Sequence, residues 1–161
     1  MTRNIFTPAA RIPEYEAWMA SALELARRAG EKGDVPIGAL VLGPDGELLG
    51  AGYNRREQDQ DPLAHAEVLA IGEAARKLGR WRLDDCTLVV TLEPCCMCAG
   101  AILNARIPRV IFGAWEEKMG ASGSQYDLLR DGRLPYTAEV YAGVLEESCS
   151  ALVREFFRNR R

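Results

Sequence analysis

The sequence predicts an α/β fold in which one sheet carries helices on both faces. Strand-like and helix-like segments alternate through the middle of the 161-residue chain. The central segment CTLVVTL, residues 86–92, is a continuous apolar run, which is typical of a strand covered on both faces. A chain of this length commonly makes one domain. We therefore expect a single domain over residues 1–161, with residues 1–12 flexible.

The first third of the chain predicts one helix followed by a hairpin. Pro13 can open a helix whose apolar residues recur at helical spacing, and Gly30 and Gly33 end it. Residues 35–43 and 47–54 predict the two strands of a hairpin, with the turn PDG between them.

A loop and a second helix are expected between the hairpin and the central strand. The polar run RREQDQ, residues 55–60, favours the loop. Asp61 can cap a helix, and Pro62 suits the first turn of one. We expect this helix to run to about Leu78, because Gly79 follows it.

The remaining elements complete the alternation. Pro94 is expected to open a third helix, and RVIFGA, residues 109–114, predicts a short strand. A loop rich in Gly and Ser follows at residues 120–124, and AEVYAGV, residues 138–144, predicts a last strand. The chain ends in a helix. Its expected buried stripe consists of Leu145, Cys149, Leu152, Val153 and Phe156.

Composition excludes several classes of protein. The net charge is −3, so any attraction to nucleic acid has to come from a local patch. No apolar run approaches the roughly 18 residues of a membrane span, and the N-terminal segment lacks the apolar core of a signal peptide. We therefore expect a cytoplasmic protein without a membrane partner, in a compartment where thiols stay reduced.

The cysteines predict a metal site or a reactive thiol rather than a disulfide framework. There are five of them, an odd number, and three stand within PCCMC at residues 94–98. Residues three apart share one face of a helix, so Cys95 and Cys98 can bind one ion while Cys96 packs elsewhere.

His65, the only histidine of the chain, completes this constellation with Glu67. Both can reach one ion if it lies just off the N-terminus of their helix, where the positive end of the helix dipole favours thiolates. One imidazole and two thiolates suit zinc with an open fourth position for water. Glu67 is then the expected proton acceptor.

Structural alternatives stay open at this point. A lone histidine on an apolar helix is often a core residue, and a glutamate in a first turn often only complements the helix dipole. Cys86 or Cys149 could also close the site as a fourth, structural ligand.

The motif H-A-E followed by P-C-x-x-C matches the signature of the zinc deaminases. DPLAHAEVLAI, LVVTLEPCCMCAGAILNARI, RVIFGAWEEKMGASGS and the ending EFFRNRR together resemble the bacterial tRNA-specific adenosine deaminases. The resemblance covers nearly everything from Val35 onwards. It implies a three-layer α/β/α fold of the cytidine deaminase type, with a five-stranded mixed sheet, and a homodimer with one Zn²⁺ per subunit. It also implies hydrolysis of the wobble adenosine, position 34 of a tRNA anticodon, to inosine with release of ammonia, classically on an arginine tRNA.

The resemblance also implies roles for individual residues. His65, Cys95 and Cys98 would bind zinc, and Glu67 would shuttle protons. The implied contacts to the anticodon stem-loop are Asn54, Ala66, Glu116, Lys118, Phe156, Arg158 and Arg160. An amide such as Asn54 offers both a donor and an acceptor to a base, although an asparagine after a strand can also simply form a turn.

Two positions depart from the family pattern. Glu116 stands where the family usually has Asp, and Trp115 beside it could stack on a base or shield the loop. The terminal arginines form a local basic patch suited to phosphate. Alternatively, they complement the C-terminus of the last helix.

Two rival functions remain. A small-molecule deaminase acting on guanine, cytosine or a nucleoside would share every catalytic residue. A non-catalytic, zinc-stabilised RNA-binding subunit would be expected to lack Glu67.

Overall fold

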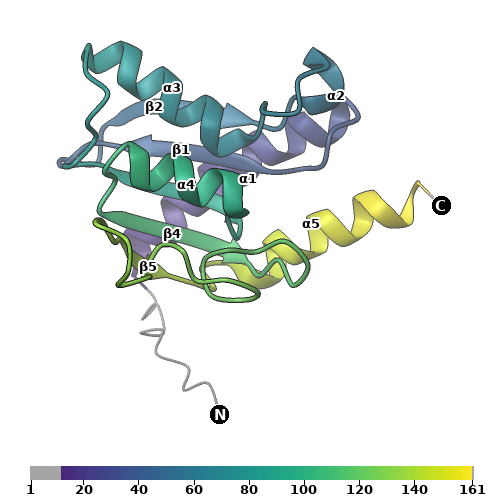
Figure 1. Ribbon diagram of the computed structural model, residues 1–161. Helices are drawn as coiled ribbons and strands as arrows, with labels where there is room; N and C mark the ends of the chain where they lie inside the picture. The colour runs from purple at the N-terminus through teal and green to yellow at the C-terminus, as the bar shows by residue number, and fades with distance from the viewer. Residues whose placement is uncertain (1–11, 161) are drawn as a thin grey trace.

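The computed structural model describes residues 12–160, and they form one five-stranded sheet with helices on both faces (Figure 1). The strand order is β2-β1-β3-β4-β5. The strands are β1 Gly38–Leu42, β2 Leu48–Tyr53, β3 Thr87–Leu92, β4 Arg109–Ala114 and β5 Glu139–Tyr141. β1 runs antiparallel to β2 and β3, whereas β3, β4 and β5 are parallel. The predicted α/β class and mixed sheet are confirmed. The flexibility expected of residues 1–12 concerns a segment that, apart from Ile12, lies outside the described residues.

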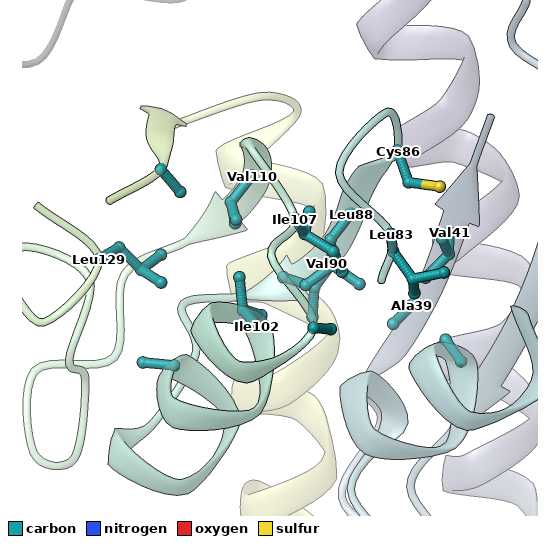
Figure 2. Packing of buried hydrophobic residues seen from close by; sticks show 14 of the residues in the cluster. Ala39, Val41, Leu83, Cys86, Leu88, Val90, Ile102, Ile107, Val110 and Leu129 are labelled. Carbon is teal, nitrogen blue, oxygen red and sulfur yellow. The ribbon is translucent and has the colours of Figure 1, made fainter. Parts of the chain in front are cut away.

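Alternate side chains of each central strand enter two separate apolar cores. On one face, α3 (Ala66–Leu78) and α4 (Cys96–Asn104) pack on Val41, Leu88, Val90 and Val110, part of the cluster in Figure 2. On the other face, α1 (Pro13–Glu31) and α5 (Glu146–Arg158) pack on Leu40, Val89 and Ile111. β3 is therefore buried on both faces, as its continuous apolar run predicts.

The layer formed by α3 depends on small residues. α3 turns Ala66, Ala70 and Ala74 towards β2, and all three are fully buried. At Gly50 and Gly52 of β2, an added Cβ would collide with the backbone carbonyl oxygens of Ala70 and Ala66. This close approach fixes the position of the N-terminus of α3, which carries His65.

Two predicted helix starts are wrong, because Asp61 and Pro94 make hydrogen bonds outside the helices they were expected to open. The helix expected from Asp61 begins at Ala66, since Asp61 Oδ1 accepts the Leu63 N–H at 2.9 Å and closes a turn. The helix expected from Pro94 begins at Cys96, and the Pro94 carbonyl accepts the Ala121 N–H at 2.8 Å.

Three smaller expectations are also corrected. The loop predicted at 55–60 contains a short helix, α2 (Arg56–Asp59). The last strand covers only Glu139–Tyr141, because Gly143 has φ +82° and turns the chain out of the sheet. Of the stripe predicted on α5, only Cys149 is buried, since the second half of this helix runs out beyond the sheet (Figure 1). Within residues 12–160, no helix has the length and apolarity needed to span a bilayer.

Candidate zinc and catalytic site

The N-termini of α3 and α4 meet at a cluster of three potential metal ligands. His65 is the N-cap residue of α3, and Cys95 is the N-cap residue of α4. Both have extended backbones and neither side chain caps its helix, so both remain available as ligands. Cys98 lies in the first turn of α4, on the same side as Cys95. The sequence prediction of two converging helix N-termini is therefore confirmed, although both helices begin later than expected, so that His65 and Cys95 are N-cap residues rather than residues of the first turn.

The distances in this cluster fit a tetrahedral zinc ion. His65 Nδ1 lies 3.5 Å from Cys98 Sγ and 3.7 Å from Cys95 Sγ. All three ligand atoms lie within 4.8 Å of one another. Zn–N bonds of about 2.0 Å and Zn–S bonds of about 2.3 Å at a tetrahedral angle separate nitrogen and sulfur by about 3.5 Å. The cluster thus has the donor set and the spacing that zinc needs.

The remaining cysteines do not reach this cluster. Cys96 is not a ligand, as predicted, but it is exposed rather than packed in the interior. Cys86 precedes β3, at the opposite end of the strand from Cys95, and lies in the apolar core of Figure 2. Cys149 is buried on α5, on the other face of the sheet. Neither Cys86 nor Cys149 can therefore act as the fourth ligand.

The electrostatics of the cluster favour a bound cation. A hydrogen bond from Cys98 lowers the pKa of the Cys95 thiol to about 4, and the neighbouring imidazole of His65 adds to this effect. The same hydrogen bond to Cys95 and burial raise the pKa of Cys98. The Cys95 sulfur also raises the pKa of His65. These three groups compete for protons, and a divalent cation removes the competition because it binds the deprotonated forms.

Glu67 is a buried carboxyl group in the first turn of α3, beside the cluster. Its side chain is 4% exposed, and its Oε2 atom has no hydrogen-bond partner among the described residues. Burial raises the pKa of Glu67 to about 7, although the charge on His65 opposes this. A carboxyl group with a pKa near neutrality can both accept and donate a proton, which general acid–base catalysis requires.

A comparison with protein families identifies this arrangement. Residues 13–114 match the family model described as the cytidine and deoxycytidylate deaminase zinc-binding region. The chain belongs to this deaminase family. Within it, the chain is 49% identical to the tRNA-specific adenosine deaminase of Bacillus subtilis, over 91% of this chain and 90% of the relative. It is 44% identical to that of Haemophilus influenzae, over 91% of this chain and 84% of the relative.

Solved deaminase structures have the same fold. One comes from a study of A-to-I editing by tRNA:A34 deaminases at the wobble position; it has a TM-score of 0.81 and 40% identity, covering 84% of this chain and 98% of that chain. A guanine deaminase from Nitrosomonas europaea has a TM-score of 0.77 and 29% identity, covering 88% of this chain and 83% of that chain. The cytidine deaminase type of fold, which the sequence resemblance implies, is confirmed.

Asn54 stands beside the cluster in this deaminase, directly after β2. It is buried, and its Oδ1 accepts the Ala66 N–H at 3.0 Å. This bond satisfies a free N–H at the start of α3, so Asn54 is more than a turn-former. The bond also orients the amide. Ala66 uses the oxygen of Asn54, and the NH₂ group remains as the donor that a substrate could use. Ala66 is itself fully buried under this contact.

The segment after β4 brings Glu116 and Lys118 to the carboxyl ends of β3 and β4, the end of the sheet where the cluster lies. β3 and β4 are parallel neighbours, so the residues after their ends lie side by side, and Cys95 forms a bridge with Gly120. Glu116 Oε1 accepts the Lys118 N–H at 2.9 Å. The Trp115 ring packs edge to face on Phe112, with centroids 4.9 Å apart, which favours the shielding alternative for Trp115.

Of the RNA contacts predicted at the chain end, Phe156 and Arg158 lie on the last turn of α5, and Arg160 follows the end of that helix. Arg158 is exposed. The Arg160 guanidinium stacks on the Phe156 ring at 4.1 Å and donates to the Gly33 carbonyl at 2.9 Å. Arg160 is therefore already held within the chain, and a contact of Phe156, Arg158 or Arg160 with RNA stays a prediction.

Sequence reasoning missed Glu93, which precedes Pro94 and Cys95. Its side chain is 2% exposed and accepts hydrogen bonds from the segment after β4. The sequence contains one signal for it, because Glu93 directly follows the apolar run of residues 86–92. A charged residue there is costly to bury unless hydrogen-bond donors surround it.

Proposed function

We propose that this protein is a tRNA-specific adenosine deaminase, which converts the wobble adenosine at position 34 to inosine and releases ammonia. One observation supports the chemistry above the others. The unpartnered oxygen of Glu67 is buried beside three ligand atoms that have the spacing of a zinc site. The high identity to tRNA-specific adenosine deaminases over most of both chains supports the substrate.

His65, Cys95 and Cys98 would hold one Zn²⁺ per subunit. Zinc with three protein ligands supplies a Lewis acid that lowers the pKa of water at the open position. Glu67 takes a proton from the attacking water and delivers it to N1 of adenine, while oxygen adds to C6. Glu67 then carries the second proton to the amino group, which leaves as ammonia. Adenosine and water thereby give inosine and ammonia.

The remaining predicted site residues would bind and orient the RNA. The NH₂ group of Asn54 can donate to an acceptor atom of the extruded base. Removing that base from an anticodon loop costs little, because loop bases are weakly stacked. Ala66 is fully buried, so its part in base binding would be to hold the Asn54 amide through its N–H. Glu116 and Lys118 would meet the ribose-phosphate chain. Phe156, Arg158 and Arg160 would contact the loop and its phosphates.

The assembly and the tRNA are also part of the proposal. We infer a homodimer acting in the cytoplasm on an arginine tRNA, on the strength of the resemblance to the bacterial enzymes. A second candidate is guanine deamination, because guanine deaminases have the same fold at lower identity. A non-catalytic RNA-binding subunit fits poorly, because it would have no use for the buried carboxyl of Glu67.

Incubation of the purified, zinc-loaded protein with total tRNA tests the proposal. Inosine is read at position 34 by sequencing, with free guanine, cytosine and adenosine in parallel reactions. Inosine in tRNA, with the three free compounds unchanged, is the expected result. Turnover of free guanine without inosine in tRNA would favour the second candidate.

A further inference from the structure

The buried carboxylate of Glu93 joins the zinc-ligand segment to the loop at residues 115–124, here called the substrate loop. Four hydrogen bonds from this loop end on it. Glu93 Oε2 accepts the Glu116 N–H at 2.9 Å. Glu93 Oε1 accepts the Ser122 and Ser124 N–H groups, both at 3.0 Å, and the Ser124 hydroxyl at 2.9 Å.

These bonds determine the backbone at Glu116. Its N–H donates to Glu93, and its carbonyl accepts the Gly120 N–H at 2.9 Å. The Ser124 hydroxyl lies 2.8 Å from the same carbonyl and shares its single hydrogen between this oxygen and Glu93. Its side chain in turn accepts the Lys118 N–H. The orientation of both predicted RNA contacts in this loop therefore depends on a single carboxylate.

The loop is packed closely around that carboxylate. At Gly120, an added Cβ would collide with the Glu93 carboxyl carbon, the Ser124 hydroxyl and the Glu116 carbonyl. Main-chain bonds fasten the other side of the loop, because Ala121 donates to the Pro94 carbonyl. Glu93 is consequently the side chain that holds the Glu116 end of the loop against the residues next to Cys95.

Both oxygens of Glu93 accept, so no neutral isostere can replace the side chain. A glutamine has one acceptor oxygen and one NH₂ group. In either orientation its NH₂ group faces at least one N–H donor of the substrate loop. The glutamine variant therefore loses a hydrogen bond and places two donors against each other in the buried interior. This costs more than the loss of a hydrogen bond at the surface.

We propose that Glu93 is a positioning residue for substrate binding: it sets the conformation in which Glu116 and Lys118 meet the RNA. It does not touch the reacting atoms. This inference rests on the proposed function, because it takes RNA as the ligand of the substrate loop. A purely structural role would instead affect folding or zinc binding and leave the substrate affinity of the loaded enzyme unchanged.

The test compares Glu93→Gln, Glu93→Asp and two serine variants with the wild type. Ser124→Ala removes the hydroxyl whose single hydrogen can be donated to Glu93 Oε1 or to the Glu116 carbonyl, both within hydrogen-bond distance. Ser122→Ala is its matched control, because the buried Ser122 hydroxyl has no hydrogen-bond partner within residues 12–160 and the Ser122 N–H bond to Glu93 remains. Zinc content, thermal unfolding, kcat and KM on an anticodon stem-loop, and amide hydrogen exchange are measured for each protein.

We expect Glu93→Gln to keep its zinc and to raise KM by about tenfold, the loss that one buried hydrogen bond produces, with a smaller change in kcat. Amide exchange should accelerate at Glu116 and Ser124 and not in α3. Ser124→Ala should raise KM in the same direction, Ser122→Ala should leave KM unchanged, and Glu93→Asp should give a partial effect.

An unchanged KM in zinc-loaded Glu93→Gln would overturn the proposal. Loss of zinc or global unfolding in Glu93→Gln, together with a wild-type KM in Ser124→Ala, would also overturn it in favour of a structural role. If the wild type itself does not edit the stem-loop, the proposed function has failed. Amide exchange then still decides whether Glu93 orders the substrate loop, and equal exchange in wild type and Glu93→Gln would refute that part.

Discussion

Replacing Glu67 with glutamine separates proton transfer from every other property of the site. The change is nearly isosteric, and the buried Oε2 has no hydrogen-bond partner to lose in the part of the chain that the structure describes, so we expect the fold and the zinc content to be retained. An amide cannot carry a proton between water, the ring nitrogen and the leaving amine. General acid–base catalysis contributes about 10²–10⁴-fold, so kcat should fall by that factor, which corresponds to about 3–5 kcal/mol in the barrier.

The same variant should alter the pH dependence of stability in metal-free protein. Burial raises the pKa of Glu67 from 4.5 to about 7, and at about 1.4 kcal/mol for each pKa unit this amounts to about 3 kcal/mol. Because the folded state holds the proton more tightly, there is no penalty below pH 4.5. The penalty grows between pH 4.5 and 7 and is complete above pH 7. Glutamine does not ionise, so the variant should gain stability over the wild type across that window.

Single-turnover deamination of a stem-loop measures the first effect, and urea unfolding of chelator-treated protein between pH 4 and 8 measures the second. The zinc content of each sample is the control. Wild-type turnover in zinc-loaded Glu67→Gln would refute the proton-shuttle role. A difference in unfolding free energy that does not vary with pH would refute the assignment of the raised pKa to this carboxyl.

Three further predictions concern residues outside the proton transfer. Iodoacetamide should modify exposed Cys96 in the native zinc-loaded protein and spare Cys86, because burial raises the pKa of the Cys86 thiol to about 12; peptide mass spectrometry reads both, and equal labelling would contradict the burial. Asn54→Ala should lower the unfolding free energy by about 1 kcal/mol, because a helix-start N–H loses its acceptor, and should also lower kcat/KM; an unchanged melting curve would count against the contact. Replacing Arg158 and Arg160 with glutamine should weaken tRNA binding and reduce its salt dependence. Filter binding at several salt concentrations measures both effects. An unchanged slope of affinity against salt concentration would show that the two arginines only stabilise the end of α5 and do not contact phosphate.

The sequence predicts the sheet well because strand burial leaves a local pattern. Alternate residues of 39–42, 88–90 and 110–112 enter opposite cores, and an apolar run is what such strands need. Helix boundaries are less visible. Asp61 and Pro94 both resemble helix starts, yet each takes part in a hydrogen bond that closes a turn or joins the substrate loop.

The zinc ligands, like the strands, leave a local pattern in the sequence, whereas the contacts of the substrate loop do not. The three-residue spacing of Cys95 and Cys98 selects them over Cys96 without a structure, since it follows from helix geometry. Glu93 receives its donors from residues 23–31 positions further along the chain. The charge at the end of an apolar strand indicates that donors must surround it if it is buried. No local pattern shows which donors these are, so the sequence alone does not reveal the role of Glu93.

X-ray absorption at the zinc edge of the loaded protein tests the three-ligand centre most directly. The geometry predicts two sulfur neighbours at about 2.3 Å, one imidazole nitrogen at about 2.0 Å and one further light atom that small anions can exchange. A third sulfur, or a fourth ligand that no added anion displaces, would show a closed structural site and contradict the catalytic account.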